Sequence, residues 1–355
     1  MAYTRATGHD VFMDLTMDHL WKQGAVQDAI TESNILWTWL KAKGRVEKIG
    51  GGSGIDVNVM SGLNTTFGAF SPYDTLNAAA QNGFTRAHYR WSRYACLLVL
   101  DKGEVDMNSG KEQIKSILKE KVTQLVGTTG EGMNKDAWAI EGPFCGDNST
   151  TENAGKKIIS VPMLCVNDPG NGVDTIGEIA AGTSPAAYWT PKNKDVAGVS
   201  SHKGYQDNIR SAINDCSRGP FGGPDMAIGG QNAWEVYVSG LDTKVRYANT
   251  ATAKMGFETV MLSNGCEFGW DYMCPDAGQE YDYDSASATK ESIFLLNSKA
   301  MGLKILKDKD WKPGKFIEPA DQETLISKHI FMGALITNNR RKLGCIENIE
   351  YANIS

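Results

Sequence analysis

The stretch Thr85–Leu100, TRAHYRWSRYACLLVL, places side chains of different character at alternate positions. Tyr89 and Trp91 fall on one side of an extended chain, and His88 and Arg90 fall on the other. A period of two is typical of a β-strand, because successive side chains of a strand point to opposite faces. At about 3.3 Å per residue, this strand would reach about 50 Å, more than a compact domain needs internally.

A second strand with the same period is predicted from Arg45 to Met60, where Ile55, Val57 and Val59 share one face. Between the two strands, residues 61–84 contain Gly62, Gly68, Ser71-Pro72 and Asn82-Gly83, which are typical of a long exposed connection. The pair is therefore predicted as an extended hairpin with a large tip. Such a projecting hairpin would contact another molecule. The glycines of GGGSG (50–54) are interpreted as a bulge or bend in the strand, since no Lys-Ser or Lys-Thr follows to complete a phosphate-binding loop.

Two helices are predicted near this hairpin. After Thr31 and Asn34, either of which could cap a helix, Ile35, Leu36, Trp39 and Leu40 recur at helical spacing, and Gly44 provides a stop. The sequence Ser109-Gly110-Lys111-Glu112 forms a capping box, so a helix should begin there and extend to Trp138. A kink or a break is an equal alternative to one continuous helix, because the segment contains Gly127, Gly130 and Gly132.

The rest of the chain alternates short helices and strands. Residues 141–205 are expected to be mostly irregular, with an apolar run from Ile158 to Cys165. The remaining predictions are helices at 205–216 and 231–240, and strands at 226–228, 292–297, 301–306 and 323–337. This alternation predicts an α+β fold in which helices flank a sheet.

Composition narrows the class of protein. A chain of 355 residues suits two closely connected domains, and a net charge of −6 argues against a general nucleic-acid binder. Its seven cysteines form no C-x-x-C pair, which favours free thiols in a reducing cytoplasm. The start, MAYTRATGHDVF, lacks the features of a secretory signal, and no apolar stretch approaches the length of a membrane span. No contact with a membrane is expected.

The search for catalytic chemistry finds little. The five histidines do not pair at metal-ligand spacing, and His88 and His329 are interpreted as structural residues of strands. The acidic-aromatic segment Asp271–Asp284, which includes Asp276, Glu280 and Asp282, could bind a hard cation or supply paired carboxylates, so a metal-dependent hydrolase remains an alternative. A solvated surface loop is the favoured interpretation. No catalytic residue, metal or cofactor is predicted.

Six blocks of sequence, taken in order, resemble one family of tailed-phage major capsid proteins. They are WLKAKGRVE (39–47), TTFGAFSPYDTL (65–76), NSGKEQI (108–114), NDCSRG (214–219) with PDMAIGGQNAWEVY (224–237), FLLNSKAMGLKILKDKDW (294–311) and FMGALITNNRRKLG (331–344). Each block is weakly specific, whereas their succession spans nearly the whole chain. The resemblance implies the Hong Kong 97 fold and a structural role instead of an enzymatic one.

The resemblance also implies a division of the chain. An N-terminal arm would cover 1–45, an extended E loop 46–103, a P domain with a long spine helix and long strands 104–149 and 291–337, and an A domain 150–290. It leaves the placement of 338–355 open. The polar segment 276–291 is longer than the family pattern, and no charged helical segment precedes the arm, which implies a separate scaffolding protein.

On this interpretation the subunit assembles as hexamers and pentamers into an icosahedral head that encloses double-stranded DNA without reading its sequence. The expected partners are other copies of the chain, the scaffolding protein, the portal protein and a decoration protein, in a virion assembled in the host cytoplasm. A bacterial encapsulin, which shares the fold but encloses cargo enzymes, is the alternative. The residues predicted to contact neighbouring subunits are Trp21, Trp37, Phe67, Phe70, Tyr73, Asp74, Arg86, Arg90, Arg340 and Arg341. Asn338–Lys342, the basic cluster that contains the last two, could instead touch DNA.

Overall fold

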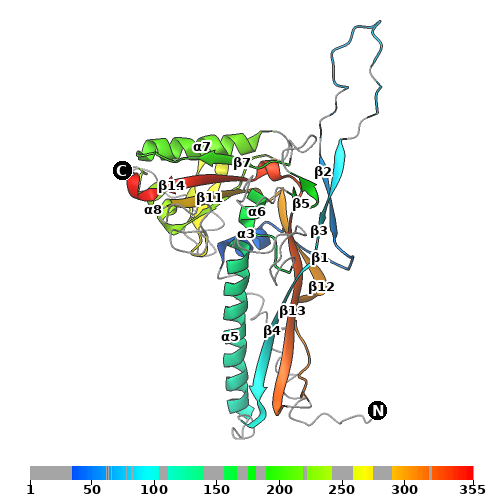
Figure 1. Cartoon of the computed structure of the whole chain (residues 1–355), viewed down its shortest axis with the longest axis vertical. Coiled ribbons are helices and arrows are strands. Elements are labelled where there is room, and N and C mark those ends of the chain that lie inside the picture. Colours follow the sequence, from blue (N-terminus) through cyan, green and yellow to red (C-terminus); the bar gives the residue numbers. More distant parts are fainter. Residues whose placement is uncertain are drawn as a thin grey trace.

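The computed structural model describes residues 34–60, 62, 64, 66–76, 78–80, 83–103, 111–138, 156–165, 175–180, 189–218, 222–241, 259–274, 290–319 and 322–354. Figure 1 shows an elongated molecule, in which a long sheet and a long helix form a body. A second sheet with its own helices lies beside one end of this body, and a narrow hairpin projects beyond it. The predicted α+β class is confirmed.

The body is a four-stranded sheet in the order β1-β12-β13-β4. Its strands are β1 (Val46–Ile49), β4 (Ser92–Asp101), β12 (Met301–Pro313) and β13 (Thr324–Thr337). β13 confirms the long strand predicted at 323–337, and its 14 residues extend about 46 Å at 3.3 Å per residue. β12 is longer than the strand predicted at 301–306. β13 pairs antiparallel with β4 over ten residues, from Thr324↔Asp101 to Gly333↔Ser92.

One face of this sheet is covered by α5 (Lys111–Trp138). Leu98 and Leu100 of β4 and Leu325 of β13 form a buried cluster with Leu118, Val122, Leu125 and Val126 of the helix. The helix runs unbroken for 28 residues, about 42 Å, so the continuous alternative is the correct one. Its glycines are tolerated because its last turns pack Met133, Ala137 and Trp138 into the main core. Ser109 of the predicted capping box lies outside the described residues.

The predicted first helix is α3 (Ile35–Ala42), and it ends two residues before Gly44, as the stop signal indicates. Asn34 occupies the N-cap position, but its side chain makes no capping hydrogen bond. Its Nδ2 instead donates to the carbonyl oxygen of Gly130, in α5, at 3.3 Å. Asn34 therefore connects two helices, and Thr31, the other capping candidate, lies outside the described residues.

The second sheet has six strands in the order β7-β14-β11-β8-β10-β9. They are β7 (Lys192–Asp195), β8 (Met226–Gly229), β9 (Val260–Met261), β10 (Glu267–Trp270), β11 (Lys290–Leu296) and β14 (Gly344–Glu350). The helices α7 (His202–Ser217) and α8 (Gln231–Ser239) share one buried cluster with Phe268 and Ile293 of the sheet. The one-turn helix α6 (Val161–Cys165) packs Leu164 with Phe294 and Cys345 in the other cluster. The predicted helices and the short strand near 226–228 are confirmed.

The predicted hairpin is shorter than the alternation indicates. Only β2 (Ile55–Met60) and β3 (Phe84–Tyr89) pair with each other, from Ile55↔Tyr89 to Met60↔Phe84. β1 pairs with β12, and β4 pairs with β13, so both belong to the body. The first predicted strand is interrupted at Gly51 and Gly52, which have φ of +154° and +125°, and the second is interrupted at Arg90–Trp91. The two strands predicted at 45–60 and 85–100 are therefore four strands in two sheets.

Strand pairing also corrects the predicted boundaries. Lys290–Leu296, grouped from the sequence with the long strands of the body, pairs with β14 and β8 in the six-stranded sheet. The C-terminal segment, whose placement was open, supplies β14 to this same sheet. A two-stranded ribbon of β5 (Thr175–Ile176) and β6 (Ile179–Ala180) lies within the region expected to be irregular. No helix in the described part of the chain is long and apolar enough to cross a membrane.

Candidate assembly surface

The tip of the projecting hairpin exposes large apolar side chains. Phe67 and Tyr73 are 97% and 99% exposed, and Phe70 and Leu76 are 67% and 66% exposed. Phe84, at the start of β3, is also exposed. Because apolar side chains gain about 1.5–3 kcal/mol each when they are buried, such a group is typical of a surface that meets a partner. Leu76 and Phe84 were not predicted, although they belong to the same apolar set.

Local hydrogen bonds shape the tip. The carboxylate of Asp74 accepts a hydrogen bond from the amide of Ser71 at 2.7 Å, and the Asp74 amide donates to the Ser71 carbonyl at 2.9 Å. Asn64 Oδ1 accepts from the amide and the hydroxyl of Thr66 at 2.8 and 2.6 Å. Short polar side chains thus form the turns that hold the aromatic rings outward. Asp74, predicted as a contact to a neighbour, has a defined role in its own turn.

Charged residues hold the stem of the hairpin together. Asp56 in β2 faces Arg86 and His88 in β3, with Oδ2 3.2 Å from the guanidinium and Oδ1 2.7 Å from His88 Nδ1. The hydrogen bond with His88 and the charge of Arg86 lower the pKa of Asp56. Arg86, a predicted intersubunit contact, therefore has an ion-pair partner in its own hairpin. Arg90 lies exposed at the break between β3 and β4.

Four hydrogen bonds hold the base of the hairpin in place. The Tyr89 hydroxyl donates to the Thr337 carbonyl at 2.8 Å and accepts from its amide at 3.3 Å, so β3 is fixed to the end of β13. The His88 amide donates to the Gly177 carbonyl at 3.0 Å. Trp91 Nε1 donates to the Gly52 carbonyl, also at 3.0 Å, and this bond connects the two positions where the strands are interrupted. The hairpin is therefore held at its base and exposed at its tip.

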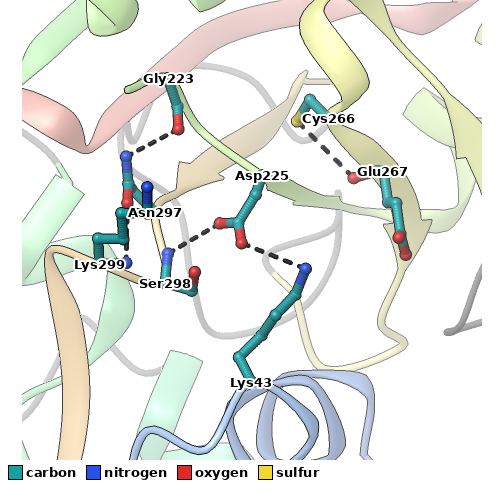
Figure 2. A network of polar contacts seen from close by, with 8 residues as sticks. All are labelled: Lys43, Gly223, Asp225, Cys266, Glu267, Asn297, Ser298 and Lys299. Atoms are coloured by element: carbon teal, nitrogen blue, oxygen red, sulfur yellow. Dashed lines mark hydrogen bonds and ion pairs between the residues drawn. The ribbon is translucent and has the colours of Figure 1, made fainter. Parts of the chain in front are cut away.

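The two sheets meet at a polar junction, shown in Figure 2. Asp225, which precedes β8, accepts a hydrogen bond from the amide of Ser298 at 2.8 Å, in the turn between β11 and β12. Its other carboxylate oxygen lies 3.4 Å from Lys43 Nζ, at the end of α3. Asn297 Nδ2 donates to the Gly223 carbonyl at 2.7 Å. One carboxylate thus links both sheets and α3.

The basic cluster predicted to meet a neighbour or DNA lies mostly inside the chain. Arg340 and Lys342 are each only 1% exposed. The Arg340 guanidinium donates from Nε to the Leu164 carbonyl at 3.2 Å and from Nη2 to the Met163 carbonyl at 3.1 Å. Arg340 therefore has almost no surface to offer a neighbouring subunit or DNA, whereas the contact predicted at Arg341 stays a prediction. Arg341 is half-buried beside them.

The cations of this cluster satisfy helix carboxyl ends. Arg340 binds the last carbonyl groups of α6, which have no partner within a five-residue helix. Lys342 Nζ donates to the carbonyl oxygens of Cys216, Arg218 and Gly222, at 3.4, 2.9 and 2.9 Å, where α7 ends. Positive charge is favourable there because the helix dipole is negative at its carboxyl end. Burial lowers the pKa of Lys342, and the charge of Arg341 lowers it further.

The tryptophans predicted as anchors to a neighbour are part of the core of their own chain. Trp37 and Trp39 in α3 are 6% and 1% exposed. Trp37 also lines an apolar pocket of about 210 Å³ with Met133, Trp311 and Phe331. Trp37 therefore packs mainly within its own chain, and its predicted contact with a neighbour stays a prediction, because helical spacing identifies an apolar face and not what covers it. Trp21 lies outside the described residues.

The acidic segment is described only at its start. Asp271 is buried, and its Oδ1 accepts from Asn134 Nδ2 and from the Met273 amide, both at 2.9 Å. Burial raises the pKa of Asp271, although these hydrogen bonds oppose the shift. Asp276, Glu280, Asp282 and Asp284 lie outside the described residues. Within the described ranges, no three His, Cys, Asp or Glu side chains are grouped to hold a metal ion.

His88 and His329 are structural residues of strands, as predicted. His88 contacts Asp56, and the buried His329 places Nδ1 3.4 Å from the Trp311 carbonyl oxygen. The cysteines within the described residues are free, which agrees with the expectation of unpaired thiols.

No protein-family model matches the sequence, and no curated protein matches it. Solved structures match the fold. The capsid asymmetric unit of cyanophage A-1(L) is similar in structure, with a TM-score of 0.54 and 12% sequence identity. The match covers 88% of this chain and 93% of the cyanophage chain. The holo-SrpI encapsulin complex of Synechococcus elongatus PCC 7942 is similar over 89% of both chains, with a TM-score of 0.52 and 10% identity. The chain therefore has a Hong Kong 97-like fold, found in phage capsids and in encapsulins.

Proposed function

We propose that the chain is a shell-forming structural subunit, the major capsid protein of a tailed bacteriophage. The observation that carries this proposal is the exposed aromatic tip of the hairpin, on a fold that phage capsid proteins share. Large apolar side chains exposed on a projection suit contact with another copy of the chain.

The parts of the molecule correspond to those of a capsid subunit. On this proposal the hairpin of β2 and β3 is the E loop, α5 is the spine helix, and the four-stranded sheet completes the P domain. The six-stranded sheet with α7 and α8 is the A domain, near the centre of each capsomer. Of the predicted N-terminal arm (1–45), residues 1–33 lie outside the described residues.

These surfaces suit assembly into a closed shell. Assembly requires many contacts of modest strength, because misplaced subunits must dissociate before the shell closes. Hexamers and pentamers of the chain would form an icosahedral head around double-stranded DNA. A net charge of −6 favours an inner wall that does not trap the DNA. A scaffolding protein, a portal protein and a decoration protein are the proposed partners, and the mature virion is the proposed location.

An encapsulin-like compartment is the second candidate, because the fold is similar to that of the SrpI encapsulin. The fold supports the two candidates equally. The two candidates differ in what the shell contains. A capsid would package DNA and depend on a scaffolding protein, whereas an encapsulin would recruit an enzyme that bears a targeting peptide.

The test is negative-stain electron microscopy of the full chain, expressed alone and then with a candidate scaffolding protein. Closed shells, or rings of five and six subunits, are the expected result. A monodisperse small species under both conditions would overturn the proposal. Shells that form without a scaffold and capture a peptide-tagged enzyme would favour the encapsulin candidate.

A further inference from the structure

An apolar pocket lies where α3 meets the four-stranded sheet and the last turns of α5. Its volume is about 210 Å³, and it is lined by Trp37 of α3, Met133 of α5, and Trp311 and Phe331 of the sheet. Each of these side chains is at most 6% exposed. An engineered apolar cavity of about 150 Å³ in another protein binds benzene. The pocket is therefore large enough for one aromatic ring with a short substituent.

One wall of the pocket is built on an irregular part of β12. Asp310 pairs with Phe331, and Lys312 pairs with Ile330. Because Phe331 and Ile330 are consecutive in β13, Trp311 is left as the extra residue of a β-bulge. Its φ of +53° lies in the left-handed region, which is unfavourable for a bulky residue. The Trp311 ring stacks on Phe331, with centroids 5.5 Å apart and an interplanar angle of 23°. The bulge thus turns a large ring into the wall of the pocket.

The lining of the pocket also includes a hydrogen-bond donor without a partner. Trp37 Nε1 is buried and finds no acceptor among the described residues. A buried donor that lacks an acceptor is unfavourable, and an acceptor on a bound molecule would remove that cost. A ligand for this pocket should therefore carry an acceptor atom beside its apolar part.

The rim of the pocket carries more positive than negative charge. Lys41, one turn after Trp37 on α3, and Lys48 of β1 are both exposed and both line the pocket. Asp310 is the single acid among the described residues that line it, and Lys48 Nζ lies 2.7 Å from its carboxylate. Two lysines and one aspartate give the lining a net charge of +1. This charge favours an anionic group at the mouth of the pocket.

We infer that this pocket binds a small carboxylate that carries one aromatic ring. The ring would lie among the apolar side chains, a carboxylate oxygen would accept a hydrogen bond from Trp37 Nε1, and Lys41 would attract the charge. The ligand would contact α3, α5 and the sheet together, so binding should stabilise the body of the subunit. This inference goes beyond the proposed function, because it holds whether the shell encloses DNA or an enzyme.

Isothermal titration calorimetry of the full chain tests the site with three probes that differ only in their polar group: phenylpropionate, phenylpropanol and phenylpropylamine. Phenylpropionate should bind at one site per chain, at least tenfold more tightly than either other probe, and should raise the melting temperature. The absence of phenylpropionate binding would overturn the inference. Equal affinity for the three probes, or tightest binding of the amine, would overturn it as well.

Two variants test whether the probe binds in this pocket. Met133→Trp fills the pocket, so it should abolish phenylpropionate binding while the circular dichroism spectrum stays unchanged. Because a larger side chain in the core can disturb folding, Lys41→Gln provides an independent measurement at an exposed position. It should weaken phenylpropionate binding at least fivefold and leave phenylpropanol binding unchanged. Lys203→Gln, exposed on α7, is the matched control and should bind phenylpropionate like the wild type. If Lys41→Gln also binds phenylpropionate like the wild type, the pocket is not the binding site and the inference fails.

Discussion

The hairpin tip and the turn Arg340–Lys342 reverse the usual distribution of side chains. The tip exposes aromatic rings to water, whereas the turn buries two cations that are each 1% exposed. Each arrangement would be unfavourable for an isolated side chain. The difference lies in the partners, because the buried cations find carbonyl groups of their own chain and the exposed rings find none among the described residues.

This comparison teaches that the available partner, and not polarity alone, decides where a side chain lies. The ends of α6 and α7 leave carbonyl groups that only a donor can satisfy, so a cation is drawn inside. Among the described residues the tip contributes nothing to the core, and on the proposed function its rings contact a neighbouring copy. Substitutions at the two regions should therefore affect different properties.

The largest effect on stability is expected for Arg340→Met. The change removes two charge-assisted hydrogen bonds to Met163 and Leu164 and leaves buried carbonyl groups without donors. The free energy of unfolding should fall by about 3 kcal/mol or more, because hydrogen bonds to charged groups contribute about 1.5–3 kcal/mol each. Urea denaturation followed by circular dichroism measures this.

Arg210→Met is the matched control for the buried arginine. Arg210 pairs with Asp207 at 3.3 Å, and its side chain is 59% exposed. The loss should stay below about 0.5 kcal/mol, as for other exposed pairs. Equal effects at both positions would show that the carbonyl contacts of Arg340 do not stabilise the fold.

The second prediction concerns a buried acid. Burial and the nearby charge of Asp195 raise the pKa of Glu347 to about 7, from 4.5. Between about pH 4.5 and 7 the folded chain retains a proton on Glu347 that the unfolded chain releases, so the contribution of this group to stability is fully present below about pH 4.5 and is lost as the pH rises toward 7. The loss is about 3 kcal/mol, at 1.36 kcal/mol per unit of pKa.

Glu347→Gln should abolish this part of the pH dependence while keeping an acceptor for Asn193 Nδ2, which lies 2.5 Å from Oε1. Denaturation of both proteins between pH 4 and pH 8 measures the difference. Glu235→Gln, at an exposed position of α8, should keep the wild-type profile. A difference between wild type and Glu347→Gln that does not change with pH would contradict the assignment.

The third prediction concerns the exposed tip of the hairpin. Tyr73→Ala should leave the free energy of unfolding within about 0.5 kcal/mol of the wild type, because the ring is 99% exposed. It should weaken each intersubunit contact by about 2 kcal/mol, as expected for an aromatic anchor. Light scattering at increasing subunit concentration reports assembly. A normal yield of stable particles would remove Tyr73 from the interface.

The smallest effect is expected at the junction of the two sheets. Asp225→Asn removes the charge that faces Lys43 but keeps an acceptor for the Ser298 amide, so it should cost about 0.5–1 kcal/mol. Asp225→Ala loses both partners and should cost about 1–2 kcal/mol. Thermal unfolding of the two variants measures the order, and equal losses would mean that the Ser298 hydrogen bond contributes nothing.

Local pattern predicted most elements of the fold correctly. The spacing of Ile35, Leu36 and Trp39 identified α3, and the turn-rich entry before Met226 identified β8 and α8. The period of two identified the hairpin but overestimated its length, because an alternating pattern does not reveal which strand lies alongside. β1 and β4 have the same period as β2 and β3, and only their partners β12 and β13 separate them.

The candidate surface was predicted in part. Phe67, Phe70 and Tyr73 lie at the exposed tip, whereas Trp37 and Arg340 proved to be buried in their own chain. Helical spacing marks an apolar face for Trp37 but not the surface that covers it. The run Ala95–Leu100 carries a signal for two covered faces, and that signal becomes informative only when α5 is seen to cover one of them.

The sequence by itself determined the kinds of element, the glycine breaks and the apolar tip, because these depend on neighbours a few residues away. The tertiary structure alone decided which strands share a sheet and why Arg340 and Lys342 lie inside. Arg340 and Lys342 bind carbonyl groups of Met163, Leu164 and Arg218, more than 100 residues away in the chain, and β1 and β4 pair with strands that are similarly distant. Contacts over such separations are set by the packing of whole elements, which no local periodicity records.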